Sequence, residues 1–115
     1  MIPMRERIPV CPHSIREDIK KELVFALEKL ERGSGLTLKF GSGLRCEECN
    51  TSVGGVKNSA HLRGLAVDIA VGGSVLRFKI LLQAISQGFC RIGIGRGFVH
   101  LDLDINLPQR VAWLY

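Results

Sequence analysis

The sequence has few aromatic residues and no long apolar run. Trp113 and Tyr115 are its only tryptophan and tyrosine, whereas nucleic-acid-binding modules usually combine basic residues with several stacking aromatic side chains. Its apolar stretches are also too short to cross a bilayer, which takes about 20 consecutive apolar residues. We therefore expect neither a nucleic-acid-binding protein nor a membrane-spanning one.

The amino terminus lacks the marks of a secretory signal. Residues 1–14, MIPMRERIPVCPHS, include basic residues but no continuous apolar segment and no small-residue cleavage site. Acidic residues are in the minority, since 16 Lys and Arg outnumber 11 Asp and Glu and give a formal net charge of +5. A positive charge favours association with an anionic surface, of which a cell-wall polymer is one kind.

The length of 115 residues suits one domain with one core, so we expect a monomer with a single domain over residues 1–115. Apolar residues at helical spacing predict helices over Ser14–Arg32, with Ser14 and Glu17 as a capping box, and over Gly73–Gly88. Alternating or short apolar runs predict four strands: Leu36–Phe40, Leu65–Val71, Arg91–Ile94 and Phe98–Leu103.

These elements predict an α+β fold in which the helices flank an antiparallel sheet. The segment Gly41–Ser59 is rich in Gly, Ser, Asn and charged residues, and long polar connections of this kind are often functional. The tail from Asp104 to Tyr115 ends in Trp113, Leu114 and Tyr115, and we expect it to pack back on the domain.

Three polar residues stand where strands would otherwise be apolar. Asp68 interrupts LAVDIA, and His100 and Asp102 share one face of FVHLDL. Buried carboxylates and imidazoles are costly unless they are paired or bind a metal. Gly64 permits a tight bend that would bring His61 close to Asp68. Two histidines and one aspartate could hold zinc and leave a fourth position open, as in catalytic sites.

The four cysteines allow several interpretations. Cys46 and Cys49 form a CxxC motif, which could be half of a structural zinc site, a redox pair or two unrelated thiols. A four-cysteine zinc site would need a second CxxC motif, but Cys11 and Cys90 stand alone. The pattern therefore favours free or partly buried thiols in a reducing compartment.

Two segments resemble the zinc D-alanyl-D-alanine carboxypeptidase family, which includes phage endolysins and murein endopeptidases. They are SGLRCEECNTSVGGVKNSAHLRGLAVDI, from Ser42 to Ile69, and GIGRGFVHLDLD, from Gly93 to Asp104. The family signature S-x-H-x-x-G-x-A-x-D, followed by H-x-D, is present as Ser59, His61, Gly64, Ala66, Asp68, His100 and Asp102. Ordered motifs in several parts are far more specific than one short motif.

The resemblance implies the hedgehog/DD-peptidase fold and a zinc ion held by His61, Asp68 and His100. It implies hydrolysis of D-amino-acid-containing stem peptides or cross-links of peptidoglycan by zinc-activated water. Arg45 would contact the substrate and assist catalysis, because a guanidinium suits a carboxylate or a developing oxyanion. Ser59 would orient the loop or the ligand through its hydroxyl.

One departure concerns the general base. Many family members have an acid three residues before the last zinc histidine, but here that position is Gly97. Asp102 is the remaining candidate. It could accept a proton from water, or it could instead hold a ligand or Arg45 in place.

Two other functions remain open. The missing acid at Gly97 is compatible with a non-catalytic, zinc-containing cell-wall binding module of the same fold. A structural zinc protein that uses Cys46 and Cys49 is a further reading, and the sequence favours it least. Small size and the absence of a signal indicate a phage-type enzyme that acts on the wall after release.

Overall fold

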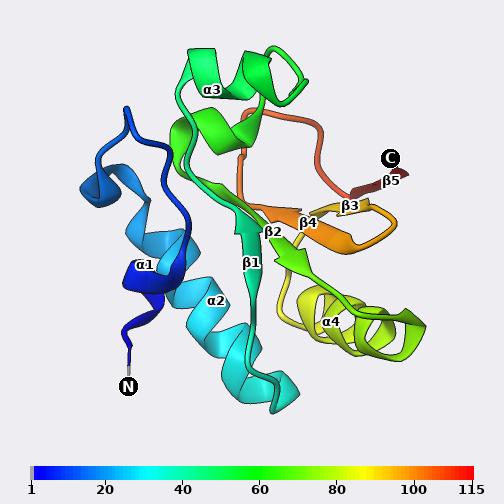
Figure 1. Ribbon diagram of the computed structural model, residues 1–115. Coiled ribbons are helices and arrows are strands. Elements are labelled where there is room, and N and C mark those ends of the chain that lie inside the picture. Colours follow the sequence, from blue (N-terminus) through cyan, green and yellow to red (C-terminus); the bar gives the residue numbers. More distant parts are fainter. Residues whose placement is uncertain (1) are drawn as a thin grey trace.

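The computed structural model describes residues 2–115 and has an α+β architecture (Figure 1). The strands form one sheet in the order β1-β2-β4-β3-β5. The strands are β1 (Phe40–Ser42), β2 (Ala66–Ala70), β3 (Arg91–Ile94), β4 (Phe98–Asp102) and β5 (Val111–Leu114). The helices are α1 (Met4–Arg7), α2 (Lys21–Ser34), α3 (Glu47–Ser52) and α4 (Ser74–Ser86), with 3-10 turns η1 (Arg16–Asp18) and η2 (Ala60–Arg63).

The two central strands divide the molecule into an apolar side and a polar side. Successive side chains of a strand point to opposite faces, and Asp68 of β2 is the register partner of His100 of β4. Both therefore lie on the same face. The residues that the two strands contribute to the opposite, core face are Val67, Ile69, Val99 and Leu101.

Helices α2 and α4 pack on the core face and contact each other (Figure 1). The buried stripe of α2 consists of Leu23, Leu27 and Leu30 at spacings of four and three residues, and burying each leucine contributes about 1.5–3 kcal/mol. Helix α4 adds Ile80 and Ala84. The polar face is thus left free of large helices.

The first long helix begins later than the sequence predicts. We expected it to start at Ser14, but α2 starts at Lys21 and is preceded by the short turn η1. Ile19 adopts an extended backbone, which lets its side chain enter the core, whereas Ile15 is 60% exposed. Ser14 caps no helix, and its hydroxyl lies 3.1 Å from Cys11 Sγ.

The predicted strand Leu36–Phe40 is also displaced, because β1 covers Phe40–Ser42. The backbone N–H of Leu38 donates to the Glu31 carboxylate at 2.8 Å rather than to a neighbouring strand. Within the polar segment that follows, the chain forms the short helix α3. The strands predicted around Asp68 and His100 and the helix predicted from Gly73 to Gly88 are confirmed within one or two residues of each end.

The sheet is mixed rather than antiparallel. β1 to β4 pair antiparallel, as expected, but β5 runs parallel to β3, with Trp113 opposite Gly93. The tail does pack back on the domain, and it does so as a fifth strand. Within residues 2–115, no helix is long and apolar enough to span a membrane.

Candidate metal centre

Three predicted ligands from three elements converge on the polar face. His61 lies on η2, Asp68 on β2 and His100 on β4. One potential ligand atom from each lies within 4.8 Å of the other two. Asp68 Oδ1 is 3.3 Å from His61 Nε2 and 3.1 Å from His100 Nδ1. The two histidines are buried, and Asp68 retains some exposure to the adjoining cleft.

The signature residues around His61 give η2 its shape. Ser59 is the residue before the turn, and its hydroxyl accepts a hydrogen bond from the backbone N–H of His61 at 3.2 Å. Gly64 ends the turn in the left-handed conformation, with φ of 70°. A side chain there would also collide with the carbonyl oxygen of Asp18. The predicted tight bend at Gly64 is therefore present.

Each histidine has one ring nitrogen engaged by a neighbouring acceptor. His61 Nδ1 lies 2.7 Å from the carbonyl oxygen of Gly43, and His100 Nε2 lies 2.7 Å from Asp102 Oδ2. A carbonyl and a carboxylate can only accept hydrogen bonds. We therefore assign the ring hydrogens of the two histidines to these two nitrogens. The other nitrogen of each neutral ring then has its lone pair towards Asp68.

This arrangement fits a cation, and zinc in particular. Two lone pairs and a carboxylate oxygen repel one another unless a positive charge lies between them. Tetrahedral zinc with nitrogen and oxygen ligands at about 2.0–2.1 Å places those ligands about 3.3 Å apart, close to the distances around Asp68. Without a metal, a proton on His100 can supply the positive charge instead. Burial lowers the pKa of His100, but its hydrogen bonds to Asp102 and Asp68 raise the pKa overall.

The carboxylate of Asp68 stays ionised in this environment. Burial raises its pKa, but in the absence of a metal the His100 and His61 rings, when protonated, donate hydrogen bonds to the carboxylate and attract its charge, which holds the pKa well below its usual range. An anionic carboxylate between two imidazoles is a donor set that a divalent cation prefers.

Comparison with known sequences agrees with this geometry. A profile of the peptidase M15 family matches residues 5–102, which span η2, β2 and β4. The chain belongs to the peptidase M15 family. No curated protein matches the chain closely enough to count as a relative. The family predicted from the signature is thus confirmed, and M15 membership implies the hedgehog/DD-peptidase fold and a peptidase, generally a zinc enzyme.

In this M15 chain, both carboxylate oxygens of Asp102 accept hydrogen bonds. The residue is 1% exposed. Its Oδ2 contacts His100 Nε2, while Oδ1 accepts from Arg91 Nε at 2.8 Å and from the backbone N–H of Asp104 at 3.1 Å. Asp102 thus contacts the imidazole through the ring nitrogen that does not approach Asp68. Of its two predicted roles, these contacts favour holding His100 in place.

A cleft of about 510 Å³ opens beside the three ligands. Arg45 and Ser59 line it, as does the turn after α3. The Arg45 guanidinium donates to Ser42 Oγ at 3.0 Å through Nη1, and its buried Nε has no partner among residues 2–115. The apolar residues that line the cleft include Val53, Val56, Phe98, Leu107 and Trp113.

Sequence reasoning missed one side of the cleft, which Arg91, Trp113 and Tyr115 form. The Trp113 ring centroid is 5.4 Å from that of His100, and the Arg91 guanidinium lies 5.0 Å from the Trp113 ring centroid. A Cβ on Gly93 would come within 2.8 Å of both aromatic rings, so this glycine makes room for them. The sequence pattern that could have predicted this side is VAWLY, because residues two positions apart, such as Trp113 and Tyr115, lie on the same face of a strand.

Proposed function

We propose that the protein is a zinc metallopeptidase that hydrolyses peptide bonds in peptidoglycan stem peptides or cross-links. The observation that carries this proposal is the convergence of His61 Nε2, Asp68 Oδ1 and His100 Nδ1 beside an open cleft in an M15 chain. His61, Asp68 and His100 would hold the zinc ion, which when bound would supply Lewis-acid chemistry for a substrate carbonyl and for water.

The residues around the metal ligands suggest how a substrate is held. Arg45 lines the cleft, where its guanidinium would bind a peptide carboxylate or stabilise charge that develops on a carbonyl oxygen. Ser59 acts mainly through His61, because its hydroxyl fixes η2. The apolar wall with Trp113 suits the side chains and methyl groups of a short peptide.

Asp102 is best described as a positioning residue. Its carboxylate fixes the tautomer and orientation of His100, and Arg91 in turn fixes the carboxylate. Asp68 and Asp102 are the acidic residues that line the cleft within the described chain. The first is a metal ligand and the second is fully hydrogen-bonded, so proton transfer from water by Asp102 would require one of its contacts to break.

A cell-wall binding module without catalysis is the second candidate. Gly97 stands at the position where the family resemblance leads us to expect an acid. Both oxygens of Asp102 are hydrogen-bonded, so the cleft has no free carboxylate among residues 2–115 other than the candidate metal ligand Asp68. The net charge of +5 serves either function, because both require contact with an anionic wall.

Incubating purified peptidoglycan with the zinc-loaded protein and analysing released muropeptides by mass spectrometry tests the proposal. Hydrolysis should yield cleaved stem peptides, and His61→Ala should abolish them. Sedimentation of the protein with the wall, without any new peptide ends, would reject the peptidase and support the binding module.

A further inference from the structure

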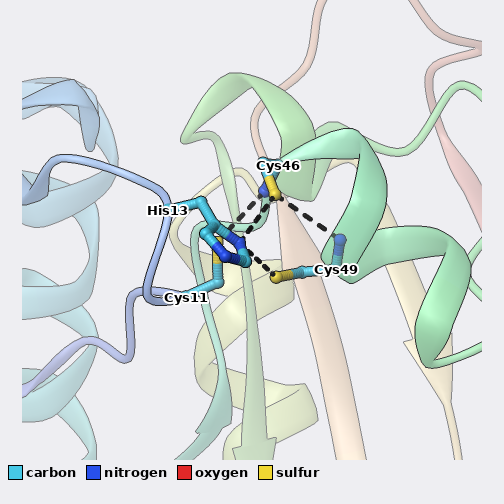
Figure 2. A group of neighbouring side chains, drawn as sticks. All are labelled: Cys11, His13, Cys46 and Cys49. Atoms are coloured by element: carbon cyan, nitrogen blue, oxygen red, sulfur yellow. Dashed lines mark hydrogen bonds between the residues drawn. The ribbon is translucent and has the colours of Figure 1, made fainter.

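A second group of potential metal ligands lies outside the cleft (Figure 2). It consists of Cys11, His13, Cys46 and Cys49, and one ligand atom from each lies within 4.8 Å of the others. All the cysteines are free thiols. The sequence alone did not indicate a role for His13. Cys11 likewise lies in no second CxxC motif.

The interatomic distances suit a tetrahedral zinc ion. His13 Nδ1 is 3.5 Å from Cys49 Sγ and 3.8 Å from Cys46 Sγ. Zinc with sulfur at about 2.3 Å and nitrogen at about 2.0–2.1 Å would hold such atoms about 3.6 Å apart. Figure 2 shows His13 and Cys11, both on the amino-terminal segment, facing Cys46, which precedes α3, and Cys49, which lies on α3.

Backbone groups also prepare the sulfurs for metal binding. The N–H of Cys46 donates to Cys11 Sγ at 3.4 Å, and the N–H of Cys49 donates to Cys46 Sγ at 3.5 Å. Hydrogen bonds to sulfur favour the thiolate, which is the form that binds metals. The two short spacings, C-x-H and C-x-x-C, each supply a pair of ligands from one local turn of chain.

We propose that Cys11, His13, Cys46 and Cys49 bind a second zinc ion whose role is structural. Four protein ligands close the coordination sphere and leave no position for water or substrate. This site is distinct from the one at His61, Asp68 and His100, and the proposal does not depend on peptidase activity.

The position of the site indicates what the ion stabilises. It joins the amino-terminal segment to the start of α3, next to hydrogen bonds between Cys11 N and the Leu44 carbonyl (3.0 Å) and between Arg45 N and the His61 carbonyl (3.1 Å). Arg45 directly precedes Cys46. The ion would therefore fix both the cleft arginine and the helix whose following turn lines the cleft.

Cobalt substitution tests the proposal, because thiolate ligands give Co²⁺ an intense charge-transfer absorption in the near ultraviolet that nitrogen and oxygen ligands lack. The reduced, metal-free full chain is titrated with Co²⁺ alone. We expect the band in the wild type, in His61→Ala and in Cys90→Ser, whose thiol lies outside the group. Cys49→Ser should lose most of the band.

A second test measures thiol reactivity in the wild-type protein, so it does not depend on whether Cys49→Ser folds. With zinc bound, a thiol reagent should modify Cys90 at least tenfold faster than the three grouped cysteines, and a strong chelator should remove that protection. The proposal is overturned if the reduced wild type shows no thiolate band, or if all four thiols react at the same rate with zinc present. Loss of the band in His61→Ala, with the fold intact, would also overturn it.

Discussion

At the scale of single residues, the metal centre depends on which nitrogen of each imidazole is free. The carbonyl of Gly43 engages Nδ1 of His61, and Asp102 engages Nε2 of His100, so the two rings offer opposite nitrogens to the same point. Residues outside the candidate set of metal ligands thus decide the geometry of the residues within it. Asp102 is the clearest case, and it is held in turn by Arg91.

Replacing Asp102 by Asn preserves shape but removes the negative charge and leaves one acceptor oxygen in place of two, so the contact with His100 Nε2 or the contacts with Arg91 and the Asp104 N–H must weaken. We expect zinc affinity to fall by about ten- to a hundredfold, with activity restored by excess zinc. Zinc affinity and turnover are measured on the same preparation. Unchanged zinc affinity, together with a loss of roughly two to four orders of magnitude in turnover at saturating metal, would instead identify Asp102 as the general base.

Arg45→Lys keeps the charge but loses the planar fork of donors. If Arg45 binds the substrate carboxylate, KM should rise about ten- to a hundredfold, since a charged hydrogen bond contributes about 1.5–3 kcal/mol. Steady-state kinetics on a defined stem peptide measures this effect. Arg96→Lys, at an exposed turn between β3 and β4, is the matched control. Equal KM values in the two variants would exclude Arg45 from substrate binding.

At the scale of elements, the aromatic side of the cleft depends on a strand pairing. β5 lies beside β3, and the absence of a side chain at Gly93 lets Trp113 and Tyr115 lie over β3 near His100. Gly97, by contrast, has open space around its Cβ position. The two glycines therefore offer a matched pair for testing the arrangement.

Gly93→Ala should displace the aromatic rings and destabilise the fold by about 1–3 kcal/mol, because a Cβ there overlaps both of them. Trp113 is the only tryptophan, so its fluorescence reports the change without interference. Gly97→Ala should leave both the emission and the stability unchanged. Identical spectra and unfolding curves for the two variants would argue against the pairing of β5 with β3.

A second interaction between elements connects α1, α2 and the chain that leads to β1. Both carboxylate oxygens of Glu31 bond the Arg7 guanidinium, at 2.8 and 2.7 Å, and one also accepts from Leu38 N–H. The hydrogen bond with Arg7 is the main cause of the lowered pKa of Glu31. The stabilisation is therefore present above the unfolded-state pKa and is lost as pH falls through the lower folded pKa.

Glu31→Gln should lower the free energy of unfolding by about 1.5–3 kcal/mol at neutral pH, because it removes a charged acceptor. The difference from the wild type should begin to shrink as pH falls below the unfolded-state pKa of about 4.3, and it should disappear once pH is below the lower pKa of the folded state. Denaturant unfolding at both pH values measures it, with Glu28→Gln on the exposed side of α2 as the control. A deficit that persists unchanged in acid would refute the ion-pair explanation.

At the scale of the whole molecule, the sequence predicts what local patterns determine. The strands around Asp68 and His100, helix α4 and the three-residue centre follow from apolar periodicity and from the ordered signature. The late start of α2 does not, because Ile19 takes an extended backbone that serves the tertiary core. The parallel pairing of β5 with β3 also escapes local reasoning, because it depends on chain segments far apart in the sequence.

The two groups of metal ligands show the same contrast. His61 and Asp68 lie seven residues apart within one motif, so their proximity could be predicted. Cys11 and His13 meet Cys46 and Cys49 across more than thirty residues of chain, and neither half alone indicates a complete site. Only the fold brings the two halves together.

Anomalous diffraction at the zinc absorption edge, from crystals of the zinc-loaded protein, tests the central claim most directly. The account predicts a peak on the polar face of the sheet, bound by His61 Nε2, the Asp68 carboxylate and His100 Nδ1. It also requires Asp102 to remain bonded to His100 Nε2. Zinc-loaded crystals without a peak between these three residues, or with zinc on His100 Nε2, would contradict the account.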